Sequence, residues 1–204
     1  VDDLETFSSS IQRKTKKYKI SNFGVGGYGG YQSLLLLEKI FDNNNDVELV
    51  IYGYTPHHEV RNVAAGSWMY LLNFFSTRGF VKLPYASIDK ENNLVRSKPI
   101  KYINLPFGDK SSLIAKLEKK IMKIKSLKRE YKQFEISKAI IKEMNKISNK
   151  NDSEFKFLIL ENLSKKKADK YKKFLIENDI AFINCPMPQG KEYVVKGEGH
   201  PSAL

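Results

Sequence analysis

The first candidate for a binding or catalytic site along the chain is the glycine-rich segment Asn22–Gly30, which has five glycines within seven positions. A backbone without side chains can turn sharply and approach a ligand closely. The segment precedes Gln32–Phe41, a Leu-rich stretch typical of a helix. A glycine loop that opens a helix directs free backbone N–H groups, with the helix dipole behind them, at a bound anion. Such a loop suits a phosphate or the oxyanion of an acyl-transfer reaction.

Two nucleotide-binding motifs resemble this loop in part. Gly24, Gly26 and Gly29 match the dinucleotide spacing G-x-G-x-x-G, but the expected acidic ribose partner is absent where Tyr52 and Gly53 stand. No Gly-Lys-Ser/Thr follows the loop, which excludes a phosphate-binding P-loop. An oxyanion site and a plain strand-to-helix turn therefore remain as alternatives.

The three histidines occupy two places, His57 and His58 in a polar loop and His200 near the end of the chain. Histidine is the commonest general acid and base at neutral pH. His57, His58 and Glu59 lack a further ligand at metal-site spacing, so we expect no metal and no cofactor. The one cysteine, Cys185, excludes an internal disulfide and a multi-cysteine metal site.

Apolar periodicity predicts the elements that position these residues. A strand over 18–23, the glycine loop, a helix to about 41 and a strand over 47–52 form a βαβ unit, which favours a parallel sheet. Ligands of such sheets bind beyond the carboxyl ends of the strands, where both the glycine loop and the histidine loop would lie. We expect Arg61 and Asn62 to cap the following helix and Trp68 to lie in the core.

The remaining pattern predicts one domain over 1–204 with an insertion at about 80–150. The further expected elements are helices over 3–14, 64–75 and 164–177, a β-hairpin within 80–105, two Lys-rich helices within 111–149, and strands over 155–160 and 180–184.

The net charge of +12 comes largely from lysines in the segments of helical period. Such runs are usually solvated helix faces, so we expect no nucleic-acid partner. No apolar run approaches the about 20 residues of a membrane-spanning helix. Both ends look cut, and a missing start makes the lack of a signal peptide uninformative about the compartment.

Three pieces stand in a familiar order: Asn-x-Gly-x-Gly-Gly-Tyr-Gly after a predicted strand, a polar loop after the next strand, and a terminal Gly-x-Gly-His-Pro-Ser-Ala. In this order the chain resembles the SGNH (GDSL-type) hydrolases, most strongly at Asn22–Gln32 and His200–Ala203. The resemblance implies an α/β fold, a three-layer α/β/α sandwich with a parallel sheet, incomplete here at both termini. It also implies serine hydrolase or acyltransferase chemistry on an ester.

The resemblance assigns His200 as general base and acid and Gly27, beside Gly26, as oxyanion donor. The family usually has an aspartate where Gly197 stands, so Glu198 becomes the nearest carboxylate to orient the histidine. No asparagine follows Gly53, and the second oxyanion donor would come from a replacement. The candidates for it are Thr55, His57 and His58.

No Gly-Asp-Ser nucleophile block occurs in the chain, and Val1–Phe7 resembles the segment that follows this block in the family. The resemblance therefore places the nucleophilic serine upstream of Val1, and these residues alone would be inactive. The expected activity is hydrolysis of an O-acyl ester on a sugar or a small lipid-like molecule. The alternatives are an O-acyltransferase of the same fold and a non-catalytic binding protein that uses the basic helices.

Overall fold

The computed structural model describes residues 6–43, 46–76, 81–161 and 163–186, together with Gly190 and Tyr193. The chain divides into two compact units, one of residues 1–26 with 186–204 and the other of residues 27–185. In the first unit, helix α1 (Phe7–Lys14) begins after Thr6, whose side chain accepts a hydrogen bond from the Ser9 amide. Thr6 is a typical N-cap residue, because its oxygen satisfies an amide that has no partner within the helix.

The strand predicted over 18–23 is wrong. Among the described residues this segment pairs with no strand, and the side chains of Tyr18 and Phe23 are exposed. Its backbone is bonded to α1 instead: Gln12 donates to the Tyr18 carbonyl at 2.9 Å and accepts from the Ile20 amide at 2.6 Å. Two backbone groups of this segment thus bond a glutamine side chain and not a neighbouring strand. The predicted βαβ unit therefore lacks its first strand.

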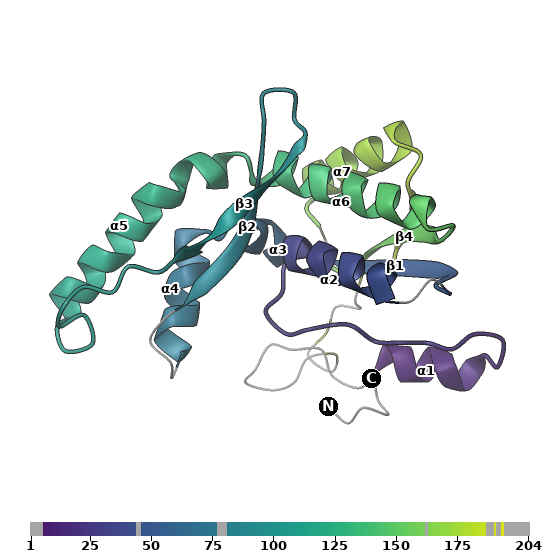
Figure 1. Ribbon diagram of the computed structural model, residues 1–204, viewed down its shortest axis with the longest axis horizontal. Coiled ribbons are helices and arrows are strands. Elements are labelled where there is room, and N and C mark those ends of the chain that lie inside the picture. Colours follow the sequence, from purple (N-terminus) through teal and green to yellow (C-terminus); the bar gives the residue numbers. More distant parts are fainter. Residues whose placement is uncertain are drawn as a thin grey trace. The chain divides into compact units, whose positions relative to one another are not determined.

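The second unit contains a parallel sheet of β1 (Leu49–Tyr54), β4 (Glu154–Ile159) and β5 (Ala181–Asn184), in the order β1-β4-β5 (Figure 1). The three strands predicted from short apolar runs are confirmed, each shifted by two residues or fewer. Helices flank this sheet. The α/β class is therefore confirmed, and the arrangement is consistent with a three-layer α/β/α sandwich.

Helices α2 (Gly30–Asn43), α6 (Gln133–Lys150) and α7 (Lys165–Glu177) share one core with the sheet. Their apolar residues recur at spacings of three and four, which places them on one side of each helix. The buried helix residues of this core are Tyr31, Leu34, Leu37, Phe41, Ile136, Ile140, Ile141, Met144, Tyr171, Phe174 and Leu175, and they meet Tyr52, Tyr54, Phe155, Phe157 and Ile159 of the sheet.

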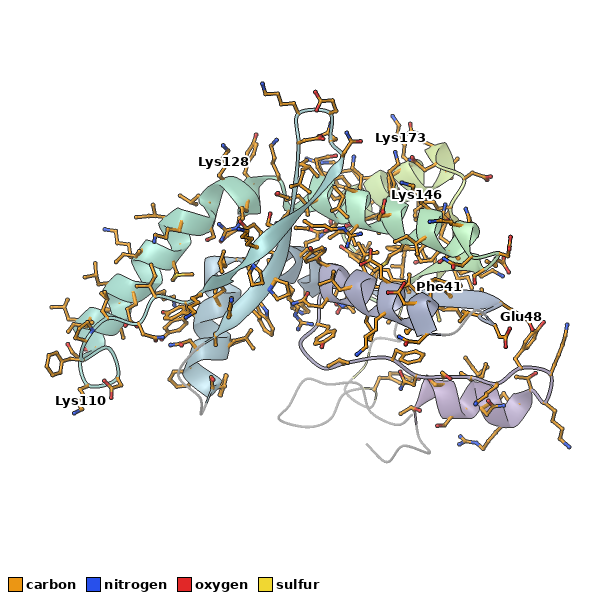
Figure 2. The ribbon with its side chains drawn as sticks, in the orientation of Figure 1. Phe41, Glu48, Lys110, Lys128, Lys146 and Lys173 are labelled. Carbon is orange, nitrogen blue, oxygen red and sulfur yellow. The ribbon has the colours of Figure 1, made fainter. Side chains whose placement is uncertain are left out.

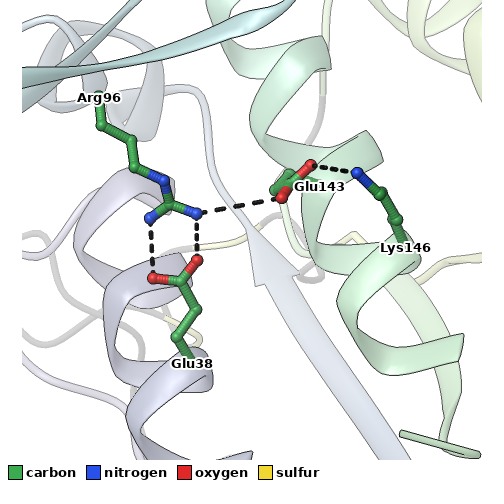
Figure 3. A network of polar contacts seen from close by, with 4 residues as sticks. All are labelled: Glu38, Arg96, Glu143 and Lys146. Atoms are coloured by element: carbon green, nitrogen blue, oxygen red, sulfur yellow. Dashed lines mark hydrogen bonds and ion pairs between the residues drawn. The ribbon is translucent and has the colours of Figure 1, made fainter. Parts of the chain in front are cut away.

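The predicted hairpin is confirmed as β2 (Lys82–Ile88) and β3 (Leu94–Lys101), which pair antiparallel. Arg96 of β3 fastens the hairpin to two helices (Figure 3). Its guanidinium forms two hydrogen bonds with the Glu38 carboxylate of α2 and lies 4.0 Å from Glu143 of α6. Glu143 also lies 3.9 Å from Lys146, so the four side chains form a surface network.

The Lys-rich stretch forms two helices, as predicted, and the first of them, α5 (Ser112–Tyr131), packs on α4 (Gly66–Phe75). The contact requires Gly66, because a Cβ there would come within 2.8 Å of backbone atoms of Met122 and Lys123. The Gly66 amide donates to Ser126 Oγ and Glu130 Oε1, both at 3.0 Å. Among the described residues, no helix is long and apolar enough to cross a membrane.

Candidate functional site

The segment after β1 is a helix, and the glycine loop packs against it. Residues expected in a polar loop form α3 (His57–Asn62), which begins directly beyond the carboxyl end of β1. Arg61 donates to the Tyr28 carbonyl at 3.0 Å, and the Tyr31 amide donates to Asn62 Oδ1 at 2.9 Å. A Cβ on Gly29 would lie 2.7 Å from Arg61 Cβ, so this approach needs glycine. The structure thus brings the two segments together although no strand precedes the loop.

Side chains already accept hydrogen bonds from two backbone amides at the start of α2. The Gly29 amide donates to Gln32 Oε1 at 3.1 Å, and Asn62 accepts from the Tyr31 amide. The prediction that Asn62 caps the next helix is wrong, because α4 begins after Ala65 without a side-chain cap. Asn62 caps α2 instead, and its amide donates to Ser137 of α6. Asn62 therefore holds α2, α3 and α6 in one arrangement.

The two predicted oxyanion glycines differ in their surroundings. Gly27 has a φ of +83°, a conformation that side chains disfavour, and the position of its Cβ lies 3.6 Å from the Trp68 ring. Gly26 is exposed and has no atom within 4 Å of the corresponding position. Of the two, Gly27 is therefore the glycine that lies against a side chain, the ring of Trp68.

Two buried donors near Gly27 have no acceptor among the described residues. They are Nε of Arg61 and Nε1 of Trp68, and the Arg61 guanidinium stacks over the Trp68 ring at 4.6 Å from its centroid. Burial lowers the pKa of Arg61, but an arginine stays charged at any physiological pH. A buried donor without a partner is costly, and such groups are rare unless a ligand or water satisfies them. This pair suits a bound anion or oxyanion.

His58 is neutral at pH 7 and is hydrogen-bonded to Tyr52. Its Nδ1 lies 2.6 Å from the Tyr52 hydroxyl, and its ring packs against Tyr52 and Tyr54. Burial, with the nearby charge of Arg61, lowers the pKa of His58 to about 4. Burial also raises the pKa of Tyr52 far above its ordinary value, so the hydroxyl stays protonated. In the tautomer with its hydrogen on Nε2, the ring accepts from Tyr52 at Nδ1 and has Nε2 as a donor.

The other predicted site residues contribute less to this geometry. His57 is exposed, and Thr55 accepts from the His58 amide through its backbone carbonyl at 3.0 Å. His200 and Glu198 lie outside the described residues. The part of the chain that the structure describes contains no group of three His, Cys, Asp or Glu side chains that could hold a metal ion.

Glu59 fixes α3 in place from its buried side. Its Oε1 accepts from the hydroxyls of Tyr54 at 2.6 Å and Tyr171 at 2.9 Å, and Lys167 Nζ lies 2.9 Å away. Burial and the neighbouring carboxylate raise the pKa of both tyrosines, so both hydroxyls stay protonated as donors. These contacts join α3 to β1 and α7, and they hold the helix that carries His58.

Burial of His58 should make stability depend on pH. Between its unfolded pKa of 6.5 and its folded pKa of about 4, the unfolded chain binds a proton that the folded chain does not. Stability is therefore lost as pH falls through this window, by about 3 kcal/mol for this residue. Urea unfolding at pH 7 and near pH 4.5 should show a smaller loss in His58→Gln than in the natural protein. An equal loss in both proteins would contradict the assignment.

The sequence does not indicate that Arg61 and Trp68 lie together beside the glycine loop. They lie on two different helices, so no single helical period connects them in the sequence. Trp68 does pack partly against the core, as predicted. No protein-family model, curated protein or solved structure significantly matches this chain.

Proposed function

We propose that the protein is a serine ester hydrolase of the SGNH type, acting on an O-acyl ester of a sugar or a small lipid-like molecule. The observation that carries the proposal is the pair of buried, unpartnered donors, Arg61 Nε and Trp68 Nε1, beside Gly27. Donors fixed before the reaction stabilise a developing oxyanion without reorganising at the moment of reaction. Because these two donors lie beside the glycine loop, the cluster supports an oxyanion site there.

In the proposed reaction, a serine oxygen attacks the ester carbonyl and His200 takes its proton. The resemblance supplies this serine, ahead of Val1, and also Glu198 as the residue that orients the histidine. The carbonyl oxygen becomes an oxyanion, which the Gly27 amide and Nε2 of His58 would stabilise. The positive charge of Arg61, which also acts on His58, and the Trp68 donor would add to this stabilisation. His200 then returns the proton to the leaving alcohol, and water releases the acid from the acyl-enzyme by the same steps.

His58 also receives a specific role from its surroundings. Its lowered pKa keeps it neutral at pH 7, and its hydrogen bond with Tyr52 holds the ring in one orientation. We assign the ring hydrogen to Nε2, so that Tyr52 donates to Nδ1. A donor fixed in this way costs no reorganisation in the transition state. Of the three candidates for the second oxyanion donor, His58 is therefore the one we assign.

Hydrolysis of p-nitrophenyl acetate by the natural full-length protein tests this assignment. His58→Ala should lower kcat by about 100-fold with little change in KM, because the lost bond forms in the transition state. His58→Asn keeps a donor and should recover part of the rate. The exposed neighbour provides the control: His57→Ala should stay within about threefold of the natural protein. Equal losses in the two alanine variants, or none in either, would contradict the assignment.

A further inference from the structure

Helix α5 has a second apolar side, which faces away from the protein. Surface helices usually bury their apolar side and expose a polar one. Here the buried positions are Glu118, Met122 and Ser126, whereas Leu113 and Tyr131 are 76% and 92% exposed. The exposed large apolar residues of this helix, which we call the α5 stripe, are Leu113, Leu117, Ile124, Leu127 and Tyr131.

The α5 stripe runs along one side of the helix, with Lys120 between Leu117 and Ile124. Its members are spaced by three, four or seven residues, and at about 100° per residue their centre falls roughly 170° around the helix from the centre of the packed side. From Leu113 to Tyr131 the stripe is about 27 Å long at 1.5 Å per residue. Figure 1 shows α5 running along the outside of α4 and the hairpin, and all five members of the stripe are exposed among the described residues.

Lysines border the stripe on both sides. The exposed lysines of α5 are Lys116, Lys119, Lys120, Lys123, Lys125 and Lys128. Figure 2 shows Lys128 on the side of the helix turned away from α4. The two glutamates of α5 do not balance this charge at the surface: Glu118 is buried and accepts from the Leu105 amide at 2.6 Å, and Glu130 accepts from the Gly66 amide. The outward side of α5 is therefore mainly apolar along its centre, where Lys120 is the one exposed charge, and cationic at its margins.

These contacts also hold the helix firmly. Arg129 donates to the carbonyl of Val63 at 3.0 Å and to that of Ala64 at 3.3 Å. Its guanidinium stacks over the Tyr85 ring at 4.8 Å from the centroid. The stripe is thus presented by a helix that is already folded and docked, and binding along it would not have to pay for ordering the helix.

We propose that the α5 stripe attaches the protein to an anionic membrane surface, with the helix lying parallel to the bilayer. A helix with Leu, Ile and Tyr in a row and lysines beside them is the kind that lies in the headgroup region. The leucines and Ile124 would enter the acyl boundary, and the lysines would extend toward lipid phosphates. Attachment of this kind needs no membrane-spanning helix.

A second copy of the chain fits this surface less well. Two such helices packed along their stripes would place lysines opposite lysines, which is unfavourable. A face about 27 Å long and 10 Å wide also offers roughly 300 Å², against about 800 Å² per partner in a stable protein interface. A bilayer has no such requirement, because it deforms around a ridge and supplies negative charge along its whole length.

Sedimentation with vesicles tests the proposal on the intact protein. Vesicles of equal parts phosphatidylcholine and phosphatidylserine should bind it at about 0.15 M salt, and vesicles of phosphatidylcholine alone should bind far less. Ile124→Glu should weaken binding by about tenfold or more. The matched control is Ile176→Glu, at an isoleucine of α7 that is 70% exposed against 59% for Ile124, and it should leave binding unchanged.

Two triple lysine variants distinguish the effect of the α5 surface on vesicle binding from the effect of the protein's net charge. Changing Lys120, Lys123 and Lys128 together to Gln should lower vesicle binding by roughly 100-fold. The same change at Lys166, Lys172 and Lys173 of α7 removes as much charge and should lower binding by less than about tenfold. Equal losses in the two triple variants, equal binding to neutral vesicles, or no vesicle binding would overturn the proposal. So would a dimer in analytical ultracentrifugation that Ile124→Glu dissociates.

Discussion

Replacing Glu59 by alanine is expected to lower the free energy of unfolding by about 3–5 kcal/mol, which is a large part of the stability of an ordinary domain. The carboxylate is 3% exposed and accepts from Tyr54 and Tyr171 at the same oxygen. Its removal leaves two buried hydroxyls without their acceptor, at about 1–3 kcal/mol each. Lys167 loses its partner too, but its side chain is 29% exposed and can reach water.

Urea unfolding of two variants, Glu59→Gln and Glu59→Ala, distinguishes loss of the charge from loss of the hydrogen-bond acceptor. Glu59→Gln keeps an acceptor oxygen for the tyrosines and loses only the charge, so its loss should fall between zero and that of alanine. The control is Glu154→Ala, which removes an exposed carboxylate 3.0 Å from Lys156 and should cost less than about 1 kcal/mol. If Glu59→Ala were as mild as Glu154→Ala, the buried network would not hold α3.

Replacing Phe157 by alanine should cost about 3–5 kcal/mol. This residue is fully buried on the central strand β4, and its ring lies 5.3 Å from that of Tyr54, 5.8 Å from Tyr52 and 6.0 Å from Tyr171, between centroids. The cost combines the lost burial of the ring with the cavity left among side chains that cannot collapse into it. Phe157→Leu should lose less, because it fills most of that space.

Phe74 provides the control for this substitution. Its side chain is 70% exposed at the end of α4, so Phe74→Ala should change the free energy of unfolding by less than about 1 kcal/mol. Thermal unfolding of both variants, followed by circular dichroism, gives the comparison. A loss below about 1 kcal/mol for Phe157→Ala would mean that this aromatic cluster is not the core of the sheet.

The sequence predicts the elements whose signals are local. β1, β4 and β5 are short apolar runs bounded by turns, and α5 and α6 follow the helical period, so their positions come out nearly right. The segment 18–23 has a similar apolar pattern and is not a strand. What decides its conformation is the side chain of Gln12 from α1, a contact that no periodicity reveals.

The candidate site likewise combines features that are local in the sequence with contacts that are not. The glycine content of the loop predicts a close approach, and Gly29 makes one against Arg61. The sequence offers three replacement donors without a preference, and only the contact with Tyr52 distinguishes His58. Trp68 joins the glycine loop because α3 and α4 pack beside it, and that packing is a tertiary event. Side-chain contacts between different elements, such as those between the glycine loop, α3 and α4, are therefore visible only in the structure.

The proposed mechanism depends on a serine that His200 activates for attack on an ester. Fluorophosphonate labelling of the natural full-length protein, with the labelled residue mapped by mass spectrometry, would identify this serine. We expect one labelled serine ahead of Val1 and loss of the label in His200→Ala. Absence of label on the folded protein, or a label that persists in His200→Ala, would contradict it.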